Sequence, residues 1–216
     1  MRAMTNTLGL AARLKHDTRS LHTQAERSGV MADLLRGRLA LADYCALLRN
    51  LQAIYAALEQ GLDQHRADAR LSRLWQPELR RLPALIQDLE RLHEGDWRAE
   101  LALMPASQAY AARLEQLAQE QPLLLLAHAY LRYLGDLYGG QMMARLVRQH
   151  YGLSGGEGTA FYAFGEAAEV ERLKQQFRAG LDALNLNAEQ ADAVVAEACE
   201  AFQRHQQLFE ELQLAA

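Results

Sequence analysis

Three side chains near the start of the chain have the types and the spacing needed to hold a charged ligand. Lys15, Arg19 and His22 are spaced i, i+4 and i+7, so on a helix two cations and one imidazole share a face. A solvated face would account for the cations alone, but the imidazole adjoins an apolar stripe that includes Leu14 and Leu21. A planar, dianionic ligand with a metal centre would use all three, because the cations would bind its carboxylates and the imidazole its metal.

A second stretch, residues 123–151, has a helical pattern with glycines in its middle. Each interior glycine costs about 1 kcal/mol relative to alanine, so Gly135, Gly139 and Gly140 must serve something that needs bare backbone. Close approach of a ligand, or a bend in the helix, would explain them. Asp136 among these glycines indicates a site that holds a small polar molecule such as water. Helix packing through small residues explains the glycines equally well.

Helices must position these residues, because the composition favours an all-α protein. Half of the 216 residues are hydrophobic, Leu and Ala outnumber Val and Ile, and only four prolines occur. The length suits one domain over residues 1–216, with residues 1–7 as a flexible N-terminus.

The apolar periodicity predicts a series of helices separated by prolines and glycines. A first helix, capped within Thr5–Thr7, runs to about Ser28, where Gly29 ends it. The segment 66–120 breaks into shorter helices at its prolines and at Gly95. The other predicted helices cover residues 32–35, 43–64, 122–151, 167–184 and 188–213, the last beginning with a capping box formed by Asn187 and Gln190.

Charge and cysteine content exclude several classes of function. The net charge is −4 and no run of Lys or Arg occurs, so nucleic-acid binding is not expected. Cys45 and Cys199 stand alone, which predicts neither a disulfide framework nor a zinc site and fits a reducing compartment. The first ten residues lack the apolar core of a signal peptide, and no apolar run approaches the ~20 residues of a membrane span. We therefore expect a cytoplasmic protein with no membrane partner.

Two motifs that lie far apart in the chain resemble those of the heme oxygenase family. They read LKHDTRSLHTQAERSGVM at residues 14–31 and AHAYLRYLGDLYGGQ at residues 127–141, and the resemblance extends from about residue 10 to residue 212. It implies a fold in which heme lies between a proximal helix and a glycine-bent distal helix. It also implies that heme, as both cofactor and substrate, is cleaved with O2 to biliverdin, CO and free iron.

Within this resemblance, His22 matches the proximal ligand of the heme iron, and Glu26 matches the acidic residue that orients it. A partner of this kind fixes the tautomer of the imidazole and tunes its basicity. The other histidines are expected to be ordinary surface or core residues. All the propionate-binding bases of the family are matched, so we expect attack at the α-meso carbon. These bases are Lys15, Arg19, Lys174 and Arg178.

On the distal side, Asp136 matches an aspartate that holds the water supplying protons to oxygen. Tyr55, Arg132 and Tyr110 match positions of the same polar network. Tyr138 stands where many relatives have serine, and we expect this larger side chain to narrow the pocket or to alter the water network. The resemblance also places four residues beside the heme, namely Tyr130, Gly135, Gly139 and Gly140.

Other interpretations explain less of the sequence. A ferritin-like di-iron enzyme needs two Glu-x-x-His motifs, and the chain has one, Glu90–His93. A non-catalytic heme carrier or sensor would need His22 and the bases, but not Asp136 with its glycines. A purely structural helical module would explain neither the face formed by Lys15, Arg19 and His22 nor the glycine-containing motif around Asp136. The enzyme is therefore the preferred interpretation.

The sequence also bears on the source of electrons. It contains neither a glycine-rich nucleotide-binding motif nor a cysteine cluster for an iron–sulfur centre. Electrons must therefore come from an external reductase or ferredoxin. A bilin-using photoreceptor, or another biliverdin acceptor, is a further expected partner.

Overall fold

The computed structural model describes residues 9–215, which form helices and turns without a β-strand. The flexible segment predicted for residues 1–7, with its caps, lies outside the described residues. The α-helices are α1 (Leu10–Asp17), α2 (Arg19–Glu26), α3 (Gly29–Leu35), α4 (Leu41–Gln64), α5 (Leu82–Leu92), α6 (Trp97–Glu100), α7 (Pro105–Glu120), α8 (Leu125–Ala129), α9 (Gly135–Tyr151), α10 (Ala167–Asp182) and α11 (Ala188–Ala215). Shorter turns are η2 (Leu71–Arg73), η3 (Pro77–Leu79), η4 (Pro122–Leu124), η5 (Tyr130–Leu134) and η6 (Ala160–Tyr162).

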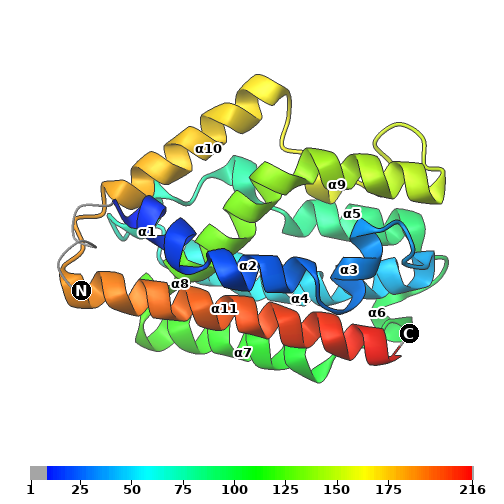
Figure 1. The fold of residues 1–216 in the computed structure, drawn as a ribbon, viewed down its shortest axis with the longest axis horizontal. Helices are drawn as coiled ribbons and strands as arrows, with labels where there is room; N and C mark the ends of the chain where they lie inside the picture. Colours follow the sequence, from blue (N-terminus) through cyan, green and yellow to red (C-terminus); the bar gives the residue numbers. More distant parts are fainter. Residues whose placement is uncertain (1–8, 216) are drawn as a thin grey trace.

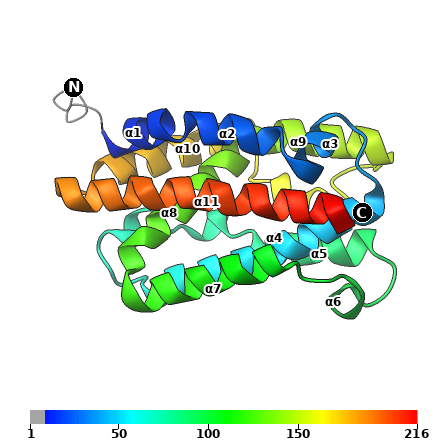
Figure 2. The ribbon, with the colours of Figure 1, turned by 60° about the horizontal axis from the view of Figure 1, so that its bottom comes forward.

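The long helices enclose one contiguous cluster of buried side chains. Helix α4 packs against α5 and α7, and α11 packs against α1, α2, α3, α7 and α8. Figure 1 shows α11 and α7 along one edge of the molecule and α9 and α10 along the opposite edge. In Figure 2, α1 and α2 continue each other along one side of α11. The predicted all-α class is confirmed, and the earliest and latest described helices are neighbours.

The first predicted helix is divided at Thr18, which corrects the expectation of one helix reaching Ser28. Thr18 has a ψ of −1°, and its hydroxyl donates to the Leu14 carbonyl at 2.7 Å, in competition with regular helical geometry. The backbone N–H of Thr18 still bonds to the Leu14 carbonyl, and that of His22 to the Thr18 carbonyl. The helical spacing therefore continues across the break, so α1 and α2 keep a common face.

Gly29 begins α3 instead of ending the first helix, which finishes at Glu26. Its φ of +47° lies in the left-handed region that glycine tolerates best. A Cβ at this position would run into the backbone carbonyl of Phe209 on α11. Only a residue without a side chain lets α3 lie directly on α11.

Most other predicted boundaries are confirmed within a few residues. Helix α4 begins at Leu41, slightly before the predicted start, and ends at Gln64 as predicted. Asn187 and Gln190 form the predicted capping box, in which Gln190 N–H donates to Asn187 Oδ1 at 2.8 Å and Asn187 N–H donates back at 3.2 Å. The segment 66–120 is broken as predicted, because its prolines lie in the first turn of η3, α5 and α7, where a missing N–H is tolerated.

The glycine-containing stretch forms α8, η5 and α9 in succession. Figure 1 shows that α8 and α9 run in different directions, so the predicted bend is confirmed. The turn η5 is π-helical and comes directly before Gly135. Because π turns interrupt the i→i−4 ladder, they are a common cause of helix bending. The sequence pattern did not predict this turn.

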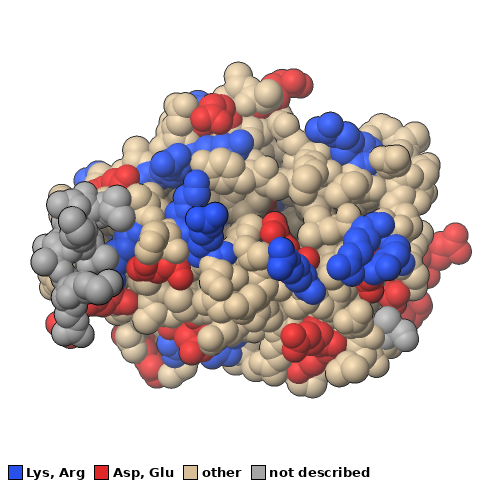
Figure 3. All heavy atoms as spheres, viewed as in Figure 1, with Lys and Arg blue, Asp and Glu red and all other residues tan. Residues whose placement is uncertain are grey.

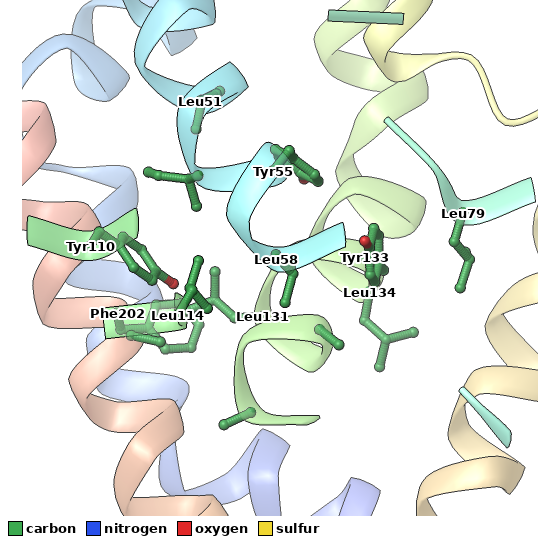
Figure 4. Close-up of a cluster of buried hydrophobic side chains, with 14 of the residues drawn as sticks. Leu51, Tyr55, Leu58, Leu79, Tyr110, Leu114, Leu131, Tyr133, Leu134 and Phe202 are labelled. Carbon is green, nitrogen blue, oxygen red and sulfur yellow. The ribbon is translucent and has the colours of Figure 1, made fainter. Parts of the chain in front are cut away.

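The core near the bend is rich in tyrosine. Tyr55 on α4 and Tyr133 in η5 are completely buried, and their ring centroids are 6.1 Å apart. Figure 4 shows both rings among the leucines of α4 and η5, with Tyr110 of α7 on the other side of α4. This packing fixes η5 against α4. Within residues 9–215, no helix has the length and apolar character that a membrane crossing requires.

Candidate active site

The predicted proximal imidazole lies at the surface of α2, with a carboxylate one turn away. His22 Nδ1 is 3.7 Å from Glu26 Oε2, and the two side chains are 54% and 52% exposed. On another side, the imidazole meets the ring of Phe202 of α11 edge-on, with ring centroids 5.9 Å apart. Glu26 and Phe202 therefore flank the imidazole, which stays accessible to a ligand.

Across from α2, helix α9 presents backbone in place of side chains. A Cβ added at Gly135 or at Gly139 would meet no atom within 4 Å, and the two glycines are one helical turn apart on the same face. Figure 3 shows that the surface is hollowed between α2 and α9. A flat ligand in this hollow could contact bare helix backbone on one side and α2 on the other.

Gly140 has a different environment. A Cβ there would lie 3.1 Å from the Tyr162 carbonyl oxygen, because η6 packs against α9. Buried charges hold η6 in place. Asp88 accepts hydrogen bonds at 2.8 Å from two amide N–H groups of η6, and Arg81 donates to the Ala163 carbonyl at 2.7 Å. The absence of a side chain at Gly140 therefore allows α9 to pack closely against η6.

The four predicted propionate bases lie near one end of the hollow. Figure 3 shows basic side chains gathered over α1, the start of α2, and α10. Lys15 and Arg19 are exposed on α1 and α2, and Lys174 and Arg178 lie one turn apart on α10. In the described part of the chain, Lys174 alone among these four has a carboxylate within 4 Å, Glu171 at 3.8 Å. The bases are thus available to an anionic ligand.

Tyr138 contacts Lys174 and Arg178, the two predicted propionate bases of α10. Lys174 Nζ lies 4.7 Å from the centroid of its ring, a cation–π distance, and Arg178 Nη1 donates to its hydroxyl at 3.5 Å. The residue is 58% exposed. These contacts associate Tyr138 with two of the predicted propionate bases, whereas the sequence predicts an effect on the pocket width or the water network.

A buried acid–base network begins directly after Gly135. The Tyr55 hydroxyl donates to Asp136 Oδ2, and Arg132 Nη2 donates to Asp136 Oδ1 at 3.1 Å. Arg132 Nε also donates to the Tyr55 hydroxyl oxygen, at 3.0 Å. Arg132 and Asp136 are spaced i, i+4, so they lie on one face of η5 and α9, and this face meets Tyr55 of α4.

Burial dominates the electrostatics of this network. Burial raises the pKa of the Asp136 carboxyl, while Arg132 and Tyr55 oppose the shift by stabilising the anion. Burial disfavours the charge on Arg132, but Asp136 and Tyr55 outweigh that effect and raise its pKa overall. Burial likewise raises the pKa of Tyr55, so its phenol stays protonated and donates. The three groups can hold one carboxylate in a fixed orientation away from bulk water.

Two buried histidines lie near this network, but only His205 is hydrogen-bonded to it; Tyr110, which the resemblance places in the network, is bonded to His128 instead. His205 Nε2 on α11 lies 3.0 Å from Arg132 Nη1. His128 Nδ1 on α8 lies 2.9 Å from the Tyr110 hydroxyl, and its Nε2 is 3.1 Å from Glu197. No spacing rule connects α11 with η5, so only the folded arrangement reveals the first contact.

The remaining predicted residue, Tyr130, lies in η5 and packs against the core. It is half-buried, and burial raises its pKa. His93, which the di-iron interpretation would use, lies 2.9 Å from Glu100 instead. An accessible imidazole, available cations and an open glycine face surround one hollow, with a buried acid beside them. These features fit heme and define a helical heme protein with oxygenase-type acid–base groups.

Comparison with known proteins gives the family. The heme oxygenase family model matches residues 8–211, and the chain belongs to the heme oxygenase family. It is therefore an oxidoreductase for which heme is both cofactor and substrate, and which degrades heme to biliverdin.

Individual relatives are similar over nearly the whole chain. A heme oxygenase of Takifugu rubripes is 37% identical over 94% of this chain and 74% of the relative. Heme oxygenase 1 of a Nostoc species is 34% identical over 94% of this chain and 86% of the relative. Among solved structures, heme oxygenase-1 of Synechocystis in complex with heme superposes with a TM-score of 0.89 at 34% identity, covering 96% of this chain and 94% of that one. A heme oxygenase of Leptospira interrogans gives 0.90 at 31% identity, covering 94% and 100%.

Proposed function

We propose that heme binds in the hollow between α2 and α9 and that the residues named above carry out its cleavage. The strongest support is the open face of Gly135 and Gly139 on the helix turn that also carries Asp136. Each of these glycines lowers helix stability by about 1 kcal/mol, and no atom of residues 9–215 beyond the adjoining helix lies within 4 Å of a Cβ built on either. This open space supports the approach of a ligand to the helix backbone.

His22 would bind the iron from the proximal side. Glu26 Oε2 lies 3.7 Å from Nδ1, on the side of the ring away from Nε2, so Nε2 would be the nitrogen that binds the metal. Lys15 on α1 and Arg19 on α2 would approach the same ligand from one side. Lys174 and Arg178 would approach it from α10. Charge pairing with two propionates would fix the rotation of the heme in its plane.

The chain's distal residues would control protons. Heme supplies the iron that binds O2 and the meso carbon that is oxidised. Asp136 is oriented by Tyr55 and Arg132, each of which uses one lone pair of a carboxylate oxygen. The remaining lone pairs can hold a water molecule at the edge of the hollow. Asp136 would pass protons to oxygen through that water, and the buried surroundings would exclude other proton donors.

The heme orientation sets the product isomer, and we propose that it is the α isomer. Support comes from the four bases on α1, α2 and α10 at one end of the hollow, which would anchor both propionates. Chromatography of the product should therefore show biliverdin IXα. Mainly β or δ isomer would mean that the propionates lie elsewhere.

Several broader features of the function also belong to this proposal. An external reductase or ferredoxin would supply electrons, and a biliverdin acceptor such as a photoreceptor would take the product. The free thiols Cys45 and Cys199 support a reducing, cytoplasmic setting. One contiguous core supports a single domain.

A titration of the purified protein with hemin, followed by a reductant in air, tests the proposed function. We expect a one-to-one change in the Soret band, then its loss as biliverdin absorption rises. Heme that binds but persists with both ferredoxin and ascorbate would favour the carrier or sensor. Absence of binding would refute the proposed site.

Replacing Gly139 with alanine should separate stability from function. The heme-free variant should be more stable by up to about 1 kcal/mol, because alanine is the better helix former and nothing obstructs its Cβ. Hemin affinity should fall by about tenfold or more, since an extra methyl in a close contact costs about 1–3 kcal/mol. Thermal melts and hemin titrations measure the two effects.

Gly140→Ala provides the contrast, because its Cβ would press on the Tyr162 carbonyl at 3.1 Å. This variant should lose stability in the heme-free state. Unchanged hemin affinity in Gly139→Ala would mean that the ligand does not approach that glycine.

A further inference from the structure

His205 occupies a position in the core that an apolar residue could fill. It is 2% exposed, and its ring lies between Tyr110 and Phe209, with centroid distances of 5.0 and 5.8 Å. Its Nε2 is 3.0 Å from Arg132 Nη1, and its Nδ1 is 3.0 Å from the Ala201 carbonyl. Both ring nitrogens therefore have a partner.

These two contacts determine which nitrogen carries the proton. A guanidinium has only N–H donors, so Nε2 must accept from Arg132 with its lone pair. The Ala201 carbonyl can only accept, so Nδ1 must donate to it. His205 is consequently the neutral tautomer with the proton on Nδ1.

The charges around the ring agree with a neutral imidazole. Arg132 faces it from η5 and His128 lies nearby on α8, while Tyr110 packs on it from α7. Burial first, and then Arg132, lowers the pKa of His205 well below its usual value. A second positive charge beside the guanidinium would be strongly unfavourable.

The Arg132 guanidinium is thereby held from three directions. Its Nε and Nη2 reach Tyr55 and Asp136, and its Nη1 reaches His205. Without His205, Nη1 would be a buried donor with no partner, and the guanidinium could rotate away from the carboxylate to find one.

We infer that His205 is a positioning residue for the reaction, because it acts as a fixed neutral acceptor that keeps Arg132 oriented toward Asp136. This inference rests on the proposed function of Asp136. It assigns to α11 a part in catalysis that involves no contact with heme, O2 or the reacting carbon.

The tautomer is tested on the heme-free protein, independently of any activity. Long-range 1H–15N correlation spectra of the histidine ring should show His205 protonated on Nδ1 and unprotonated on Nε2. The signals should not titrate between about pH 5 and pH 8, where an ordinary histidine does. A proton on Nε2, or titration in this range, would overturn the inference.

Substitution tests the consequence for turnover. His205→Leu removes the acceptor, and His205→Gln restores one at the same distance from Cα. We expect biliverdin formation to slow by about 10- to 100-fold in the leucine variant, with unchanged hemin affinity, and to recover largely in the glutamine variant. The 15Nη signals of Arg132 should shift in the leucine variant only. Phe209→Leu, which disturbs the same packing without touching Arg132, should turn over normally.

The outcomes separate this inference from the proposed function. Wild-type protein that binds hemin without forming biliverdin would refute the function and leave the tautomer result standing. Wild-type turnover in His205→Leu, or equal loss in the leucine and glutamine variants, would refute the positioning role alone. If the leucine variant does not fold, the ring spectra of the wild type still test whether His205 is the neutral acceptor that the inference requires.

Discussion

Replacing His22 with alanine should lower hemin affinity by at least about 100-fold and abolish the spectrum of nitrogen-ligated iron. Outer partners of metal ligands typically contribute about 10- to 100-fold, and the ligand itself contributes more. The variant should stay folded, because the side chain is 54% exposed and substitutions at such sites usually change stability by under about 0.5 kcal/mol. Hemin titration followed by absorbance measures the loss.

Two controls sharpen this experiment. Added imidazole should restore the nitrogen-ligated spectrum in His22→Ala, because the vacated space adjoins the accessible surface of α2. His16→Ala removes an imidazole from α1 that is 76% exposed and bonded only to Asp17 among the described residues, so it should bind hemin normally. A wild-type Soret spectrum in His22→Ala would assign the iron ligand to another residue.

Replacing Asp136 with asparagine should leave hemin affinity within a few fold of wild type yet slow biliverdin formation by about 100-fold or more. Positioned acid–base groups typically contribute about 10²–10⁴ in rate. Asparagine preserves the shape but cannot carry the proton or pair with Arg132. Single-turnover assays with a chemical reductant would measure this effect without involving a partner protein.

Stability must be measured alongside, because Asp136→Asn leaves a buried guanidinium without its anion. Breaking such a pair costs about 3–5 kcal/mol. Glu59→Gln is a suitable control, since Glu59 is a 3% exposed carboxylate that accepts from the amide N–H groups of Arg81 and Leu82. It should lose stability but keep turnover. Equal turnover in Asp136→Asn and wild type would remove this carboxylate from the mechanism.

The sequence predicted those features that depend on local spacing. The extent of α4, the capping box before α11 and the proline-started helices follow from periodicity and from residues whose preferences are strong. The set Lys15, Arg19 and His22 shares a face because the helical spacing survives the break at Thr18. The i, i+4 spacing of Arg132 and Asp136 accounts for their ion pair, although the sequence placed both in one network only through the family resemblance.

Features that depend on tertiary packing were missed. The break at Thr18 cannot be predicted from the residue type, because Thr23 makes the same hydroxyl-to-carbonyl bond, to Arg19, inside the continuous helix α2. The π turn η5 has no spacing signal, and the contact of His205 with Arg132 joins residues on separate helices. Gly140 illustrates the same limit, because its partner on η6 is visible only after folding.

The contact of α11 with the N-terminal helices has a consequence for biosynthesis. Gln206 donates to the Leu21 carbonyl across 185 positions of sequence, and Phe202 braces the imidazole of His22. Contacts of such separation form late, because the chain must close a long loop first. During synthesis on the ribosome, helix α2 would emerge early and would lack its packing partner until α11 had been made. Heme capture would therefore follow the synthesis of α11, and chains that still lack α11 would not hold a redox-active iron.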